Sequence, residues 1–238
     1  MYKIENANDL ASCLEYTNLN NIASEEEILE FLEKSKEFPF HSVVVGPNFL
    51  NLAKKELENT NIKVGTVIGF PLGIETTEMK VTNTKIALEN GADEIDVVIN
   101  LSNIKSGNYE AVKNEVIAIK DVLDGKILKI IIESKLLTDI EKTKVSKVIE
   151  EAGADYIKTS SGFNGINTFF ETVHDINIIQ KYAPKTKIKA SGGITLYKDA
   201  TRILSAGADK IGSSSAYEIV EIFDTLINNE DVEPQTII

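Results

Sequence analysis

The chain has 238 residues, 42% of them hydrophobic and 26% charged, and it carries a net charge of −12. This composition is typical of a folded globular protein with one large domain or two small ones. The negative charge argues against nucleic acid or an anionic membrane as the main partner, although a small anion could still bind at a locally positive site. The one cysteine, Cys13, excludes a disulfide within the chain and argues against a cysteine-based zinc site.

Targeting signals are not evident in the sequence. Residues 1–16 lack the apolar stretch of a signal peptide. No apolar run approaches the ~18 residues that a membrane-spanning helix needs. We therefore expect a cytoplasmic protein.

Short apolar runs alternate with helical patterns along the chain. We predict strands at 13–18, 42–46, 64–69, 94–100, 128–134, 156–160, 187–191 and 210–214. We predict helices at 24–37, 48–58, 76–90, 108–123, 139–152, 168–182, 196–206 and 215–228. Ser24 and Glu27 have the spacing of a capping box at the start of the first helix. The tripeptide Gly-Ala-Asp recurs at 91–93, 153–155 and 207–209, where the glycine can end a helix before the next strand begins.

Eight strand–helix units in a chain of this length predict one fold class. Strands that alternate with helices pair in parallel. A (β/α)₈ TIM barrel typically has about 250 residues, so we predict a single barrel domain over 1–238, with 229–238 as a loosely held tail. The alternative is an open doubly wound sheet, which usually has fewer strands and a G-x-G-x-x-G loop that is absent from this sequence.

Side chains alternate across a strand, and this alternation brings three charged residues together. The aliphatic positions of the strands should face the helices. Asp96, Lys158 and Lys189 then point to the barrel axis from the fourth, sixth and seventh strands. Two neighbouring lysines repel each other, and burial disfavours their charge, so both effects lower a lysine pKa. A neutral lysine attacks carbonyl carbons, which predicts Schiff-base chemistry, with Asp96 exchanging protons with the second lysine. The alternative without catalysis is that each lysine is a solvated or snorkelling side chain.

Three loops of small residues follow the last strands, at 160–162, 191–193 and 212–215. Loops after the seventh and eighth strands of such barrels commonly hold phosphate through backbone N–H groups and hydroxyls. Each loop alone is also an ordinary turn. Together they predict a phosphorylated carbonyl compound as substrate. No cluster of metal ligands is evident in the sequence, so the imine would be the electron sink.

These segments resemble the signature blocks of the deoxyribose-phosphate aldolase family of class I aldolases. The blocks are "VIGFPLG", "GADEIDVVIN", "KIIIES", "ADYIKTSSGF", "IKASGGI" and "IGSSSA", and they occur in family order. The resemblance implies reversible cleavage of 2-deoxy-D-ribose 5-phosphate to glyceraldehyde 3-phosphate and acetaldehyde, without a metal or organic cofactor. It implies that Lys158 forms the Schiff base, that Lys189 perturbs it, and that Asp96 relays protons. The implied substrate- and phosphate-binding residues are Thr17, Lys129, Ser161, Gly162, Gly192, Gly193, Gly212, Ser214 and Ser215.

Several positions depart from the family pattern. Glu15 stands where the family usually has the shorter Asp, which leaves its reach toward the lysines open. Gly46 stands where an Asn is usual, and Lys135 where a small or sulfur-bearing residue is common. These changes bear on efficiency and substrate range more than on reaction class. Two other functions stay open, a non-catalytic sugar-phosphate binding protein and an aldolase for a different phosphorylated sugar. Barrels of this class often pair, which leaves a homodimer open.

Overall fold

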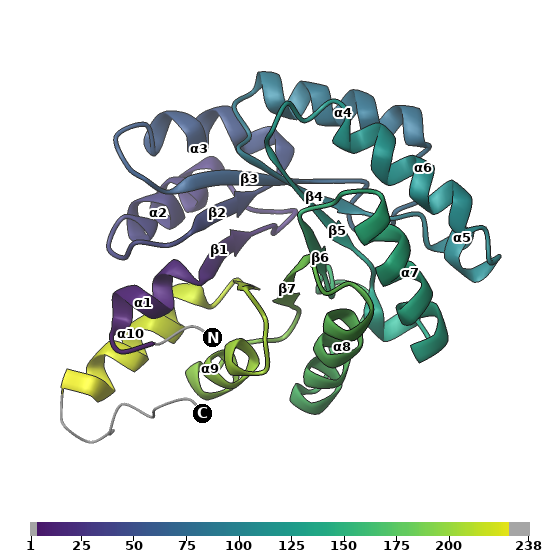
Figure 1. Ribbon diagram of the computed structural model, residues 1–238. Helices are drawn as coiled ribbons and strands as arrows, with labels where there is room; N and C mark the ends of the chain where they lie inside the picture. The colour runs from purple at the N-terminus through teal and green to yellow at the C-terminus, as the bar shows by residue number, and fades with distance from the viewer. Residues whose placement is uncertain (1–3, 229–238) are drawn as a thin grey trace.

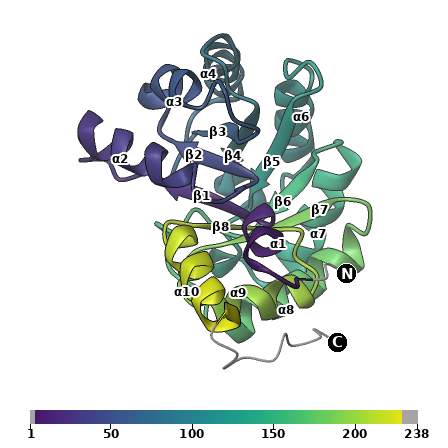
Figure 2. The same cartoon turned by 90° about the vertical axis from the view of Figure 1, so that its left-hand side faces the viewer.

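A computed structural model describes residues 4–228 (Figure 1). The tail expected at 229–238 lies outside the described residues. Eight parallel strands run in the order of the sequence and close into a barrel, because β8 pairs with β1. Helices surround the strands, as the view in Figure 2 also shows. The predicted (β/α)₈ fold is therefore confirmed. Within 4–228, no helix is long and apolar enough to span a bilayer.

Each strand lies where a run was predicted, and all except β7 differ from the prediction at one or both ends. They are β1 Leu14–Asn18, β2 Ser42–Val45, β3 Lys63–Ile68, β4 Glu94–Val98, β5 Ile127–Ile131, β6 Tyr156–Lys158, β7 Lys187–Ser191 and β8 Lys210–Ser213. β6 is two residues shorter than expected. The backbone of Thr159 still donates to the Lys189 carbonyl at 3.0 Å, so pairing continues briefly beyond the regular ladder.

The helices include two that the sequence pattern did not predict. The longer ones are α2 Glu25–Ser35, α3 Leu50–Glu56, α4 Thr77–Glu89, α6 Tyr109–Lys120, α7 Asp139–Glu151, α8 Phe169–Tyr182, α9 Tyr197–Ser205 and α10 Ala216–Asn228, with 3₁₀ turns η1 Pro47–Phe49 and η2 Ser134–Leu136. The two additional helices, α1 Ala7–Ser12 and α5 Leu101–Lys105, have six and five residues. Such lengths are too short to show a helical period. The Asn100 side chain caps α5, which is why the predicted strand 94–100 ends early.

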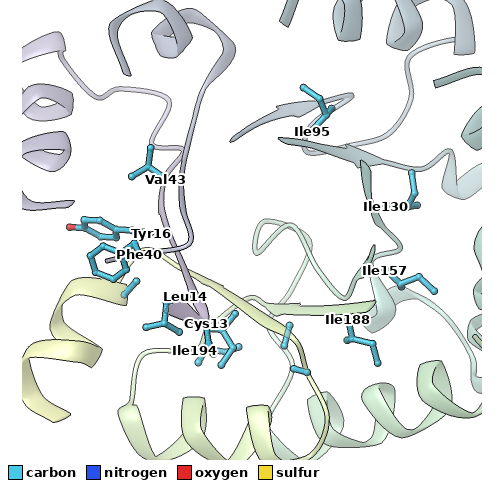
Figure 3. Packing of buried hydrophobic residues seen from close by; sticks show 14 of the residues in the cluster. Cys13, Leu14, Tyr16, Phe40, Val43, Ile95, Ile130, Ile157, Ile188 and Ile194 are labelled. Atoms are coloured by element: carbon cyan, nitrogen blue, oxygen red, sulfur yellow. The ribbon is translucent and has the colours of Figure 1, made fainter. Parts of the chain in front are cut away.

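The two faces of the strands differ in chemistry as the alternation predicted. Ile95, Ile130, Ile157 and Ile188 belong to the apolar core between barrel and helices. Figure 3 shows Ile130, Ile157 and Ile188 on the sides of their strands that face the surrounding helices. The opposite face of the same strands carries acids and lysines that are almost fully buried. A barrel interior is usually filled by branched apolar side chains, so this ionic interior marks a site.

Candidate active site

Asp96, Lys158 and Lys189 meet inside the barrel. Lys158 and Lys189 are register partners on β6 and β7, so both side chains leave their strands at one level. The Nζ of Lys158 lies 2.8 Å from Oδ2 of Asp96, and the Nζ of Lys189 lies 2.7 Å from the same oxygen. Lys158 is 3% exposed, whereas Lys189 is fully buried. The structure thus brings together the three residues that the alternation pattern selected.

The surroundings of Lys158 favour its neutral form. Burial lowers the pKa of this amine most strongly, Asp96 opposes the change, and the positive charge of Lys189 lowers the pKa further. The net result is a pKa of about 8 for Lys158. From the sequence, lysine–lysine repulsion and burial were both expected to lower this pKa. The structure makes burial the larger cause. A lysine with this pKa supplies a useful fraction of free amine near neutral pH.

Asp96 stays ionised although no solvent reaches it. Burial alone would raise the pKa of its carboxyl group. The ammonium groups of Lys129, Lys158 and Lys189 outweigh that effect, so the pKa of Asp96 lies well below its usual range. An ionised carboxylate between two amines can accept a proton from one amine and pass it to the other. Asp96 is therefore placed to relay protons between Lys158 and Lys189.

Glu15 reaches the lysines, which the sequence left open. It is fully buried on β1, and its Oε2 accepts a hydrogen bond from Lys189. Its Oε1 lies 3.3 Å from the Nζ of Lys129. The additional methylene relative to Asp therefore does not remove this acid from the cluster, since Lys189 contacts both Glu15 and Asp96.

Lys129 has a different position from the one that the family resemblance implied. It was expected to line the substrate pocket, but its side chain is fully buried on β5 and does not line the cavity. Its Nζ lies 2.5 Å from Oε2 of Glu94 and 3.3 Å from Oδ1 of Asp96. Because three carboxylates surround it, Lys129 cannot also bind a phosphate in the cavity. The sequence motif could not show how deeply this side chain is buried.

A cavity of about 990 Å³ opens above Lys158. Most of the predicted binding residues line it: Thr17, Ser161, Gly162, Gly192, Gly193, Gly212 and Ser214. Ser215 does not line it. Its backbone N–H instead donates to the Ser213 hydroxyl, and Ser213 is part of the wall. The small residues therefore gather on one side of the cavity, at the carboxyl ends of β6, β7 and β8.

Two glycines of this wall are required by close contacts. A Cβ added at Gly193, whose φ is +73°, would lie 2.2 Å from the Ile166 side chain. A Cβ added at Gly212 would lie 2.8 Å from Cε of Lys189. Gly212 therefore leaves room for the lysine side chain as well as bordering the cavity.

Glu133 is a site residue that sequence reasoning missed. It is fully buried after β5 and has a left-handed backbone with φ of 49°. Its carboxylate accepts the Ser161 N–H at 3.0 Å and the Asn164 side-chain amide at 3.3 Å. Asn164 also donates to the Pro71 carbonyl at 2.8 Å. Glu133 thereby fixes the loop after β6 that carries Ser161. Its position directly after a buried strand was the available sequence signal.

One group of potential metal ligands lies deeper in the barrel. Single ligand atoms of Glu15, His41 and Glu94 lie within 4.8 Å of one another. The His41 ring is 2.9 Å from Glu94 Oε1. The Lys129 ammonium contacts both Glu94 and Glu15, so it already supplies the positive charge that these acids need. The arrangement is an ion-pair cluster, and we assign no metal to it.

Comparison with known proteins identifies the family. Residues 7–216 match the DeoC/LacD family of aldolases. The chain belongs to this family. It is 44% identical over 208 residues to the deoxyribose-phosphate aldolase of Streptococcus suis, covering 87% of this chain and 93% of that one. The family resemblance found in the sequence is thus confirmed, and the protein is an aldolase, a carbon–carbon lyase.

Solved structures agree with this aldolase in fold. An aldolase named QR15 superposes with a TM-score of 0.87 at 38% identity, covering 94% of this chain and 99% of that chain. The deoxyribose phosphate aldolase from Aeropyrum pernix, described as having a unique tetrameric structure, gives a TM-score of 0.86 at 32% identity, with 94% of both chains covered.

Proposed function

We propose that this aldolase reversibly cleaves 2-deoxy-D-ribose 5-phosphate to D-glyceraldehyde 3-phosphate and acetaldehyde through a Schiff base on Lys158. The observation that carries the proposal is the position of this amine. It is almost buried, its pKa is about 8, and it lines a cavity that glycine and serine loops also border. The names of the relatives support the choice of sugar.

The chemistry follows from the contacts of the amine. Neutral Lys158 attacks C1 of the open-chain sugar, and the carbinolamine loses water to give an iminium ion. Removal of the proton from the C3 hydroxyl breaks the C2–C3 bond and releases glyceraldehyde 3-phosphate. The bonding electrons pass to the iminium group and form an enamine. Protonation at C2 and hydrolysis then release acetaldehyde and free Lys158. Asp96 and Lys189, which share a hydrogen bond, exchange the protons.

The phosphate would lie at the loops after β6, β7 and β8. Gly162, Gly192 and Gly193 line the cavity, and without a side chain their backbones allow a ligand to approach closely. Backbone N–H groups and serine hydroxyls are good donors to phosphate oxygens. The Lys158 amine and these loops border the same cavity, which suits a substrate with a carbonyl at one end and a phosphate at the other.

Borohydride trapping tests the proposal. The protein is incubated with acetaldehyde and sodium borohydride, and its peptides are identified by mass spectrometry. We expect a reduced two-carbon adduct on Lys158 and none in Lys158→Ala. Lys187→Ala, which changes an exposed lysine two residues before Lys189, is the matched control and should keep the adduct. An unmodified wild-type Lys158 would favour a non-catalytic binding protein. Relative cleavage rates of several sugar phosphates decide whether deoxyribose phosphate is the preferred substrate.

The remaining features of this function are also proposals. The reaction as written uses side chains of this chain and no metal or organic cofactor. A cytoplasmic location stays a prediction from the sequence. A homodimer does too, and light scattering of the purified protein distinguishes it from a monomer or tetramer.

A further inference from the structure

The proposed mechanism gives no task to Lys129, although this buried lysine forms ion pairs with three acids near the site. Its Nζ lies 2.5 Å from Glu94, 3.3 Å from Glu15 and 3.3 Å from Asp96. Two of these acids, Glu15 and Asp96, also contact Lys189, and Asp96 contacts Lys158. Lys129 is thus one acid away from both lysines of the proposed active site.

Two carboxylate oxygens depend on Lys129 for a positive charge. Within residues 4–228, Oε1 of Glu15 and Oδ1 of Asp96 are buried and accept no hydrogen bond. Each of them lies 3.3 Å from the Lys129 ammonium, while the second oxygen of each acid contacts Lys189. A buried, charged oxygen without a hydrogen bond is unfavourable unless an opposite charge is near. Lys129 supplies that charge to both acids at once.

We propose that Lys129 is a positioning residue, whose buried ammonium holds Asp96 and Glu15 in place and balances their charge, so that Lys158 can release its proton and attack a carbonyl. This inference rests on the proposed function and adds a residue to it. Without Lys129, the negative charge of Asp96 and Glu15 would act more fully on the two lysines. Lys158 would then retain its proton to higher pH, because a nearby negative charge stabilises an ammonium.

Several other charged or titratable groups lie around this cluster. On the strands they are Glu15, Lys63, Glu94, Asp96, Tyr156, Lys189 and Lys210, and His41 precedes β2. Glu94 decides the test. It makes the shortest contact with Lys129, and it is Asp96 that pairs with Lys158. Its carboxylate partly neutralises Lys129. Removing the Glu94 charge should therefore have the opposite effect on Lys158 to removing the Lys129 charge.

The experiment measures the pH at which half of the Lys158 amine is free. Acetic anhydride labelling at a series of pH values, followed by peptide mass spectrometry, reports this midpoint whether or not a Schiff base forms. We expect Lys129→Met, which keeps a similar volume, to move the midpoint up by about one pH unit. Glu94→Gln should move it down by a smaller amount. The double variant loses one charge of each sign, so its midpoint should lie between those of the wild type and Lys129→Met.

The pattern of signs separates this role from simple packing. A purely structural Lys129 would leave all midpoints unchanged, or both single variants would shift in the same direction, and either result overturns the inference. Circular dichroism establishes which variants fold. If Lys129→Met does not fold, Glu94→Gln decides alone, because an unchanged or raised midpoint contradicts the proposal. If wild-type protein gives no borohydride adduct, the proposed function fails, while the labelling midpoints still test the role of Lys129.

Discussion

Lys80 and Lys158 are both buried beside an acid, and their surroundings differ. Lys80 on α4 is fully buried, and its Nζ lies 2.7 Å from Glu115 on α6. Lys158 on β6 is almost as buried, and its Nζ lies 2.8 Å from Asp96. Burial and one ion pair are therefore common to both sites and cannot explain why we assign chemistry to only one of them.

The number of acceptors around each ammonium makes the difference. An ammonium has three N–H donors. Lys80 donates to the carbonyls of Gly73 at 3.0 Å and Val98 at 2.8 Å as well as to Glu115, so all three are satisfied. Among the described residues, Lys158 has Asp96 as its one hydrogen-bond acceptor, and it shares that oxygen with Lys189. Lys80 is held by three acceptors, whereas Lys158 lines a cavity and has a lowered pKa.

The comparison is tested most severely by replacing Lys158. Lys158→Met should lower kcat by about 10⁴-fold or more, the scale on which loss of an enzyme nucleophile acts. It should leave the free energy of unfolding at pH 7 equal or higher, because Asp96 keeps its ion pairs with Lys129 and Lys189. Cleavage assays and urea denaturation measure the two quantities. Retained turnover, or a loss of several kcal/mol in stability, would mean that Lys158 is the structural lysine of the two.

Replacing Lys80 should give the reverse result. Lys80→Met removes the partner of the buried Glu115 and two carbonyl contacts, which should lower the free energy of unfolding by about 3–5 kcal/mol. Burial already raises the pKa of Glu115 against the opposing effect of Lys80, so this carboxyl group should become protonated in the variant. Folded Lys80→Met should still give the borohydride adduct on Lys158. Denaturation and trapping on the same sample test both halves, and loss of the adduct in folded protein would contradict the division of roles.

The barrel, and the meeting of Asp96, Lys158 and Lys189 inside it, could be predicted from the sequence because both depend on a period. Strand alternation alone placed Asp96, Lys158 and Lys189 on one face, and the structure joins them through one carboxylate oxygen. The strand ends were predicted less accurately. For example, β4 stops early because Asn100 caps the helix that follows it. The short helices α1 and α5 offered no period to detect.

Contacts that depend on depth and side-chain reach could not be predicted. Lys129 stands at a family position, yet the sequence does not show that it lies beneath the cavity among three acids. Whether Glu15 reaches Lys189 depends on the barrel radius. Lys80 gave no signal at all, because its acceptors Gly73 and Val98 are backbone carbonyls of other segments. The contacts of such residues become visible only in the folded structure.

The smallest predicted effect concerns pH and separates the two lysines once more. The pKa of Lys158 is lowered from 10.5 to about 8 in the folded protein, so between these values the unfolded chain binds more protons. The free energy of unfolding should therefore rise with pH across this window, by at most about 1.4 kcal/mol per pH unit from this group. Lys158→Met should lack that contribution, and the difference between wild-type and variant urea titrations from pH 7.5 to 10 isolates it. Over the same range kcat/KM should rise with a midpoint near 8, since roughly a tenth of Lys158 is neutral at pH 7. A wild-type protein whose stability relative to the variant falls across this window would show that folding stabilises the Lys158 ammonium, which contradicts a lowered pKa.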